Sequence, residues 1–389
     1  MNITYFNFSH HLAEGRWERS SFASKWWHSF SRDPHWVPPD YLTFRRELEP
    51  GRNPHLARMS PRFIYTTAMS RRKVTPRYRE SFPLGESLLE NIPSEQIVAI
   101  CLVLSDPRRA DRAAHLALLH CTNDLESLER LLDFAATLAA EEGCQRLLAP
   151  AGLSPHLGTG LLENQWNRLP SQYTPYNPPY LPELVSGVME PIAASRLYHL
   201  DVPTGQNIAA FDQPSASRAK LVPFEPARLS GDLLPLLAHA CPSWAGFPPL
   251  DREEAAFIIR WIHRWPLIAW LAVFAERPIG FVLLQPDLAP PLRRAKGGRT
   301  LFWRAWLNRA GLKPAAQGRI LFGGVLPEWR GRGTGSQLLR QALLTAREQR
   351  WQTISIGPLP EVASEAVSFL EHRGALPQQH YRLYQQELG

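Results

Sequence analysis

The hydrophobic pattern is most regular in the second half of the chain. Apolar runs at residues 267–275 and 278–285 flank the polar pair Glu276-Arg277, which predicts a β-hairpin. An apolar run at 319–327 predicts a further strand, and apolar residues at helical spacing follow it at 334–350. The remaining elements expected there are strands at 220–226, 352–356 and 381–387, and helices at 232–240, 251–264 and 361–372.

The first half shows a similar order of elements. Two runs rich in apolar residues, 96–104 and 114–121, predict strands. A helix is expected at 124–142, because Asp124 can cap its start and Gly143 its end. A helix at 22–30 and strands at 146–149 and 196–202 are also expected.

A polar, turn-rich stretch separates the two halves and is typical of a linker. It predicts a domain at 1–203, a linker at 204–219 and a second domain at 220–389. Residues 290–318 interrupt the second domain, and Trp303 and Trp306 lie three apart within them. This spacing predicts an inserted amphipathic helix with loops.

Composition supports two folded units. The 389 residues are 44% hydrophobic and 20% charged, which is enough for two cores. The formal charge is +7, but lysine and arginine are spread without a long basic run, so no nucleic-acid partner is expected. The four cysteines form no pair at metal-ligand spacing, so we expect neither a metal nor a disulfide framework.

The chain shows no sign of membrane insertion. Its first ten residues lack a basic segment followed by an apolar one, and no apolar stretch reaches the roughly 18 residues that span a bilayer. A cytoplasmic protein is therefore expected.

The most informative segment is the loop Arg330-Gly331-Arg332-Gly333-Thr334-Gly335. An apolar strand leads into this glycine-rich turn, and a helix follows it. Glycines let the backbone approach an anion, and the amides at the start of the helix then face its phosphates. The glycine spacing is not that of a dinucleotide-binding fingerprint, and the lysine of a P-loop is absent.

Arg330, Gly333 and Gly335, preceded by Val325 and Pro327, closely resemble the acetyl-CoA-binding signature of the GNAT acetyltransferase superfamily. The resemblance implies an α/β (α+β) fold of two GNAT-like domains, each a mixed, mostly antiparallel sheet flanked by helices. It implies that strand 319–327 splays from strand 352–356 and that acetyl-CoA binds in the gap. The cofactor-binding residues it implies are Gly324, Val325, Leu326, Arg330, Gly331, Arg332, Gly333, Thr334, Gly335 and Ser336.

Two positions depart from the family pattern. Ala363 stands where the family often has a cofactor-holding Asn, and Leu370 where it often has the Tyr that protonates the leaving thiolate. Tyr381 and Tyr384 on the last expected strand are substitute candidates for this acid. Glu328 and Glu361 are candidate bases for the amine, since no carboxylate lies within 319–325.

The first half lacks the glycine loop. Cys121-Thr122-Asn123-Asp124 stands in its place, so we interpret residues 1–203 as a degenerate GNAT-like domain that shapes the acceptor pocket. The resulting function is transfer of an acetyl group from acetyl-CoA to the amine of a small molecule or peptide. A non-catalytic acyl-CoA-binding or sensor protein and an acyltransferase with a longer acyl donor remain open, as does the oligomeric state.

Overall fold

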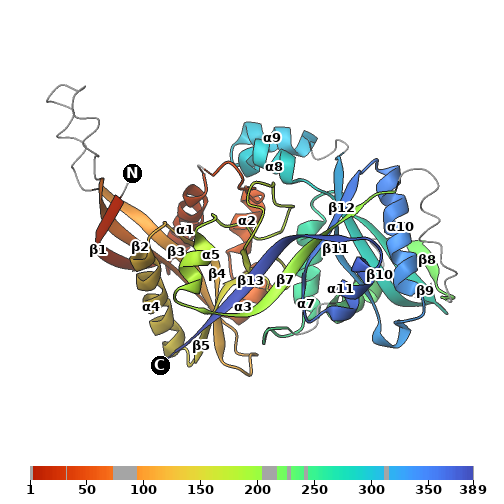
Figure 1. The fold of residues 1–389 in the computed structure, drawn as a ribbon, viewed down its shortest axis with the longest axis horizontal. Coiled ribbons are helices and arrows are strands. Elements are labelled where there is room, and N and C mark those ends of the chain that lie inside the picture. The colour runs from red at the N-terminus through yellow and green to blue at the C-terminus, as the bar shows by residue number, and fades with distance from the viewer. Residues whose placement is uncertain are drawn as a thin grey trace.

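A single sheet runs through both halves of the molecule (Figure 1). The computed structural model describes residues 3–31, 33–72, 94–203, 217–225, 229–240, 244–310 and 315–388. The first half contains β1 (Ile3–Leu12), α1 (Arg16–Ser29), α2 (Tyr41–Glu47), α3 (Pro54–Arg58), β2 (Ser60–Arg72), β3 (Ser94–Ser105), β4 (Ala113–Cys121), α4 (Leu125–Glu141), β5 (Arg146–Ala151), β6 (Leu161–Leu162), α5 (Leu181–Ser186) and β7 (Glu190–Asp201).

The second half repeats this mixture of strands and helices. It contains β8 (Lys220–Pro223), α6 (Leu234–Ala240), α7 (Arg252–Ile262), β9 (Ile268–Phe274), β10 (Arg277–Pro286), α8 (Ala289–Arg294), α9 (Leu301–Ala310), β11 (Gln317–Val325), α10 (Thr334–Glu348), β12 (Thr353–Pro360), α11 (Ser364–Glu371) and β13 (Leu376–Glu387). Most neighbouring strands are antiparallel, while β4 with β5 and β11 with β12 are parallel pairs. The predicted fold class, an α/β protein with mixed, mostly antiparallel sheet flanked by helices, is confirmed.

The last strands of the two halves are exchanged. The strand order is β1-β2-β3-β4-β5-β13-β7-β12-β11-β10-β9-β8. The final strand of the chain, β13, therefore pairs with β5 of the first half, and β7 of the first half pairs with β12 of the second. The sheet crosses the predicted boundary at residue 203, and residues 204–216 of the predicted linker lie outside the described residues. That boundary stays a prediction.

Most of the expected elements are present. The strands at 96–104 and 114–121, the helix at 124–142 and the hairpin around Glu276-Arg277 are confirmed. Asp124 caps α4 as expected, because its carboxylate accepts from the Ser127 amide at 2.9 Å. β7 and β13 each begin five or six residues earlier than expected, at Glu190 and Leu376.

The sequence did not predict β1 and β2. Both carry polar residues where an interior strand usually has apolar ones, which hides the strand pattern. In the structure, polar side chains of β1 and β2 form hydrogen bonds with one another across the strand pair. The His10 ring lies 3.1 Å from the Thr66 hydroxyl, and the His11 ring 2.9 Å from the Thr67 hydroxyl.

Helices cover both faces of the sheet in the second half. One hydrophobic cluster joins α10, α11 and the strands β7 and β12, and another joins α6 and α7 to β9, β10 and β11. Leu338, Leu339 and Leu343 of α10 are buried in the first cluster. Burial of each such side chain contributes about 1.5–3 kcal/mol to folding.

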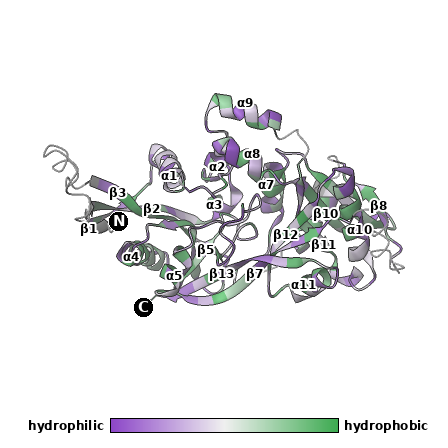
Figure 2. Ribbon diagram, turned by 45° about the horizontal axis from the view of Figure 1, so that its top comes forward, coloured by the Kyte–Doolittle hydropathy of each residue, from purple (hydrophilic) through white to green (hydrophobic). Residues whose placement is uncertain are grey.

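The predicted insertion forms α8 and α9, which stand above the sheet near α2 in Figure 2. Trp303 and Trp306 of α9 pack against a small cluster that includes Leu292 and Leu307, so the predicted helix is confirmed. Its other side exposes Leu301 and Phe302 to solvent. Across the described ranges, no helix combines the length and apolar character needed to cross a membrane.

Candidate functional site

The two parallel strands of the second half separate beside the glycine loop. β11 and β12 pair from Gln317 and Thr353 as far as Ile320 and Ile356. β11 continues to Val325 and β12 to Pro360 without further pairing between them. The splay expected from the sequence is therefore present.

Backbone geometry singles out one residue on the open edge of β11. The Leu326 amide donates to the Ile279 carbonyl of β10 at 2.9 Å, so it is not available to a ligand. The N–H and C=O groups of successive residues point to alternate edges of a strand. Those of Gly324, like those of Leu326, therefore point towards β10, and those of Val325 point towards β12. Of the three predicted backbone contacts, Val325 is the one placed to pair with a ligand in the splay.

The loop after β11 leaves the first amides of α10 available. Gly331 and Gly333 have φ of +69° and +82°, the left-handed region that glycine enters without strain. Gly333 is the N-cap of α10 and provides no side-chain cap. The amides of Thr334, Gly335 and Ser336 consequently lack intrahelical partners, as at any helix start. Free amides at the positive end of a helix dipole are the kind of group that binds an anion.

Open space and positive charge surround this helix start. A Cβ on Gly331 would meet no atom within 4 Å, and one on Gly335 would meet only Phe369, at 4.0 Å. Arg330 folds back to the Val325 carbonyl and to Glu365, each at 3.3 Å. Arg332 lies 5.1 Å from the Trp329 ring.

Arg373 is a further cation at the helix start that the sequence did not single out. Its guanidinium donates to the Ser336 hydroxyl at 2.8 Å. It follows α11, far from the loop in sequence, so only the packing of α11 beside α10 reveals it. The free amides, the open space and the arginines together fit a pyrophosphate.

The two predicted carboxylate bases are exposed and paired. Glu328 lies 3.6 Å from Arg277, and its side chain is 54% exposed. Glu361 pairs with Arg196 at 2.9 Å and is 52% exposed. Both carboxylates therefore lie at the surface and are engaged by arginines.

The two predicted tyrosine acids are buried among structural groups. Tyr384 lies in the core of the first half, where β13 crosses to β5, and its hydroxyl donates to Glu163 at 3.4 Å. Burial, followed by the nearby Glu163 charge, raises the pKa of Tyr384 to about 12. Tyr381 is fully buried and donates to the Gln379 side chain at 3.1 Å. Their catalytic roles stay predictions.

A different tyrosine lies beside Leu370. Tyr198 of β7 pairs with Ile356, the residue at which β11 and β12 part. Its hydroxyl donates to Glu371 at 2.9 Å, next to Leu370, and it lines a cavity of about 170 Å³ beside α11. Burial and then Glu371 raise the pKa of Tyr198. The sequence could not indicate Tyr198, because it belongs to the first half and arrives through the exchanged strand.

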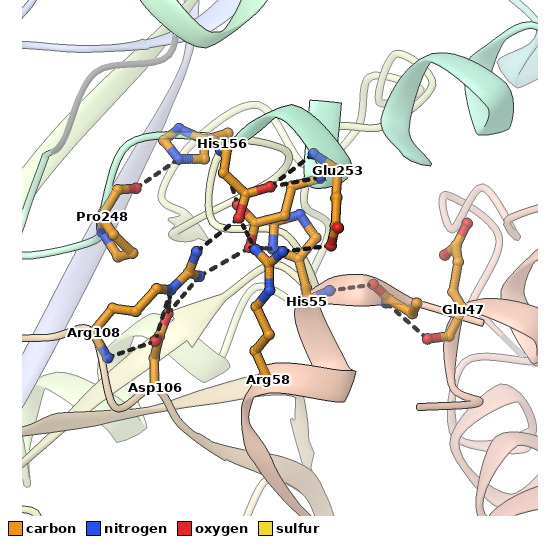
Figure 3. A network of polar contacts seen from close by, with 11 residues as sticks. Glu47, His55, Arg58, Asp106, Arg108, His156, Pro248 and Glu253 are labelled. Carbon is orange, nitrogen blue, oxygen red and sulfur yellow. Dashed lines mark hydrogen bonds and ion pairs between the residues drawn. The ribbon is translucent and has the colours of Figure 1, made fainter. Parts of the chain in front are cut away.

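A polar network joins the two halves at the start of α7 (Figure 3). The Glu254 carboxylate lies 2.9 Å from His55 and 2.9 Å from Arg108, both from the first half. Burial alone would raise the pKa of Glu254, but hydrogen bonds and charge from His55 and Arg108 lower it to about 2. Glu254 is thus a buried anion that both halves hold.

Comparison with known proteins agrees with the geometry of the loop. Residues 235–375 match the family model described as the acetyltransferase (GNAT) family. The second half of the chain belongs to the GNAT superfamily. A search of curated proteins finds no match to the sequence.

Solved structures extend the GNAT fold to the whole chain. A tandem GNAT protein from the clavulanic acid biosynthesis pathway is similar over 100% of this chain and 99% of its own, with a TM-score of 0.53 and 13% identity. A probable N-acyltransferase from Enterococcus faecalis has a TM-score of 0.53 and 7% identity over 98% of this chain and 72% of its own. A GCN5-related N-acetyltransferase from Anabaena variabilis has a TM-score of 0.51 and 10% identity over 98% of this chain and 73% of its own. The resemblance to a tandem GNAT arrangement is confirmed.

Proposed function

We propose that this GNAT protein transfers an acetyl group from acetyl-CoA to an amine. The observation that carries the proposal is the uncapped start of α10, placed by Gly331 and Gly333 at the end of a strand that leaves its parallel neighbour. The GNAT fold supports acyl transfer in general. The choice of acetyl-CoA as donor and of an amine as acceptor rests on the glycine loop and its resemblance to the GNAT acetyl-CoA-binding signature.

Each part of the site has a separate task in this reaction. The amides of residues 334–336 hold the pyrophosphate, and the Val325 backbone pairs with the pantetheine arm. The amine nitrogen bonds to the thioester carbonyl carbon, the carbon–sulfur bond breaks, and the nitrogen gives its proton to water. The leaving thiolate takes a proton, for which the Tyr198 hydroxyl is the best-placed phenol beside α11.

Gly333→Asp is expected to weaken CoA binding by about 10- to 100-fold. An aspartate at an N-cap accepts hydrogen bonds from the following amides, so its carboxylate would occupy the anion site and repel phosphate. Calorimetric titration with CoA measures the loss. The matched control is Gly143→Asp, since Gly143 also has a left-handed φ, of +76°, with no atom within 4 Å of its Cβ. Equal CoA affinity in both variants would refute the assigned anion site.

Tyr198→Phe is expected to lower kcat by about 100-fold while the Kd for CoA is unchanged. The change removes the proton that the thiolate would take but keeps the buried ring. The measurement is steady-state acetylation of a primary amine that the wild type accepts, over a range of pH. Tyr384→Phe tests the earlier candidate in the same assay, and it should leave kcat unaltered if Tyr198 is the acid. An unaltered kcat in Tyr198→Phe would exclude it as the acid.

A non-catalytic CoA-binding protein is the second candidate function. It is favoured by one observation, the buried aliphatic Leu370 at the position where the family often has its acid. CoA binding by the wild type without acetylation of any primary amine in a broad panel would support this function over the first.

A further inference from the structure

A cavity of about 250 Å³ lies where the two halves meet, away from the glycine loop. Its lining runs from the ends of β4 and β5, at Leu119 and Ala151, to α7 of the second half. Its wall is mostly apolar, and its aromatic members include Trp26, Trp36, Phe44, Tyr173, Trp261 and Trp265. A cavity of about 150 Å³ is enough to hold a benzene ring, so this one has room for a ring and a short chain.

One carboxyl group in the cavity wall lacks a cation. Glu47, the last residue of α2, is 8% exposed, and its Oε1 atom has no hydrogen-bond partner within the described part of the chain. Figure 3 shows its side chain pointing away from the network around Arg108. Burial raises the pKa of Glu47 to about 8. The negative charge of Asp40 adds to this rise, and a hydrogen bond from Trp261 opposes it.

The other ionisable groups in the wall already have partners. Asp40 pairs with Arg264 at 3.0 Å and also with Arg304. His55 pairs with Glu254 at 2.9 Å. Burial also raises the pKa of Tyr173, so that its phenol stays neutral at physiological pH. A ligand cation in this cavity would therefore meet Glu47 as the group without a counter-charge.

We propose that this cavity binds a small arylalkylamine, with its ring among the tryptophans and its ammonium group on the Glu47 carboxylate. Aromatic faces attract both a ring and a cation, and a desolvated carboxylate forms strong hydrogen bonds to an ammonium group. A buried unpaired carboxyl would be costly in a purely structural wall, whereas an amine gives it a partner.

The amine would be the acceptor of the acetyl group, an assignment that rests on the proposed function. Leu157 and Tyr173 line the cavity and also pack against the hydrophobic cluster that contains Phe322 of β11. The cavity wall therefore adjoins the hydrophobic cluster to which Phe322 of β11 belongs. Binding of the amine itself does not depend on CoA and can be tested alone.

The experiment is calorimetric titration of the full chain, without CoA, with 2-phenylethylamine and with its neutral analogue 2-phenylethanol. The amine is expected to bind at least about tenfold more tightly than the alcohol. Glu47→Gln, which keeps the shape of the side chain, should abolish this preference and leave alcohol binding unchanged. Glu49→Gln, two residues away and exposed, should behave as the wild type.

Proton release provides a second readout. The amine enters as an ammonium ion at pH 7, while Glu47 with a pKa of about 8 is mostly protonated in the free protein. Binding should release about one proton, seen as a dependence of the heat on the buffer, and Glu47→Gln should release none. Asp40, His55, Tyr173 and Tyr176 are the other titratable groups of the wall, and the variant separates their contribution from that of Glu47.

Equal affinity for amine and alcohol, or amine binding unaffected by Glu47→Gln, would overturn the proposal, as would the absence of binding by either compound. CoA titrations of the same variant keep the two proposals apart. Lost amine preference with intact CoA binding supports the cavity assignment. Amine binding in a protein that binds no CoA would leave the cavity assignment standing and remove the proposed acetyl transfer.

Discussion

A chain that ends at residue 203 is expected not to fold on its own, and neither is one that begins at residue 217. The first fragment lacks β13, which covers the edge of β5 and brings Tyr384 into the core of the first half. The second lacks β7, which covers the edge of β12 and contributes Tyr198 and Leu200 to the α10 cluster. Each fragment would expose unpaired strand edges and lose core side chains.

Thermal unfolding followed by circular dichroism measures this result. Each fragment alone should show no cooperative transition, whereas both fragments expressed together should recover one, because each then supplies the strand that the other lacks. A cooperative transition in either isolated fragment would contradict the exchanged sheet and favour two independent domains.

Glu254→Ala is expected to destabilise the whole chain by about 3 kcal/mol, the lower part of the range for breaking a buried ion pair. The change leaves buried His55 without its partner and removes one of the acceptors of Arg108. It also removes the side chain that accepts from the Asp251 amide at 3.1 Å, which begins α7. The free energy of unfolding in urea measures the loss.

The neighbouring Glu253→Ala provides the matched control. Glu253 contacts Arg58 but is 74% exposed, and exposed pairs contribute about 0–1 kcal/mol. The effect of Glu254 should also depend on pH. Its folded pKa of about 2 lies below its usual 4.5, so its contribution is complete above about pH 4.5 and is lost as the pH falls towards 2. Equal losses in the two variants at pH 7 would contradict the buried network.

The glycine loop could be predicted from the sequence because everything that defines it is contiguous. An apolar strand, glycines able to adopt positive φ and the start of a helix occupy 319–336 without a break. Short-range geometry then fixes the direction of the helix amides. Arg373 is the exception at this site, since it approaches Ser336 only through the packing of α11.

The rest of the site depends on contacts between distant segments. Nothing in the spacing of β7 or β13 indicates that they exchange places, since both have an ordinary strand pattern. The sequence therefore places the candidate acid on β13, whereas the exchange brings Tyr198 of β7 to α11. Glu47 was missed for a similar reason, because its polar side chain ends a short helix whose burial is set by Trp261 and other residues far away in sequence.

The central claim is that CoA is held by the start of α10, and a crystal structure with CoA present tests it most directly. The account predicts pyrophosphate density within hydrogen-bond distance of the Thr334, Gly335 and Ser336 amides, with the pantetheine arm beside Val325. Pyrophosphate bound instead beside Thr122 and Asn123 at the start of α4 would contradict it and would make the first half the cofactor-binding one.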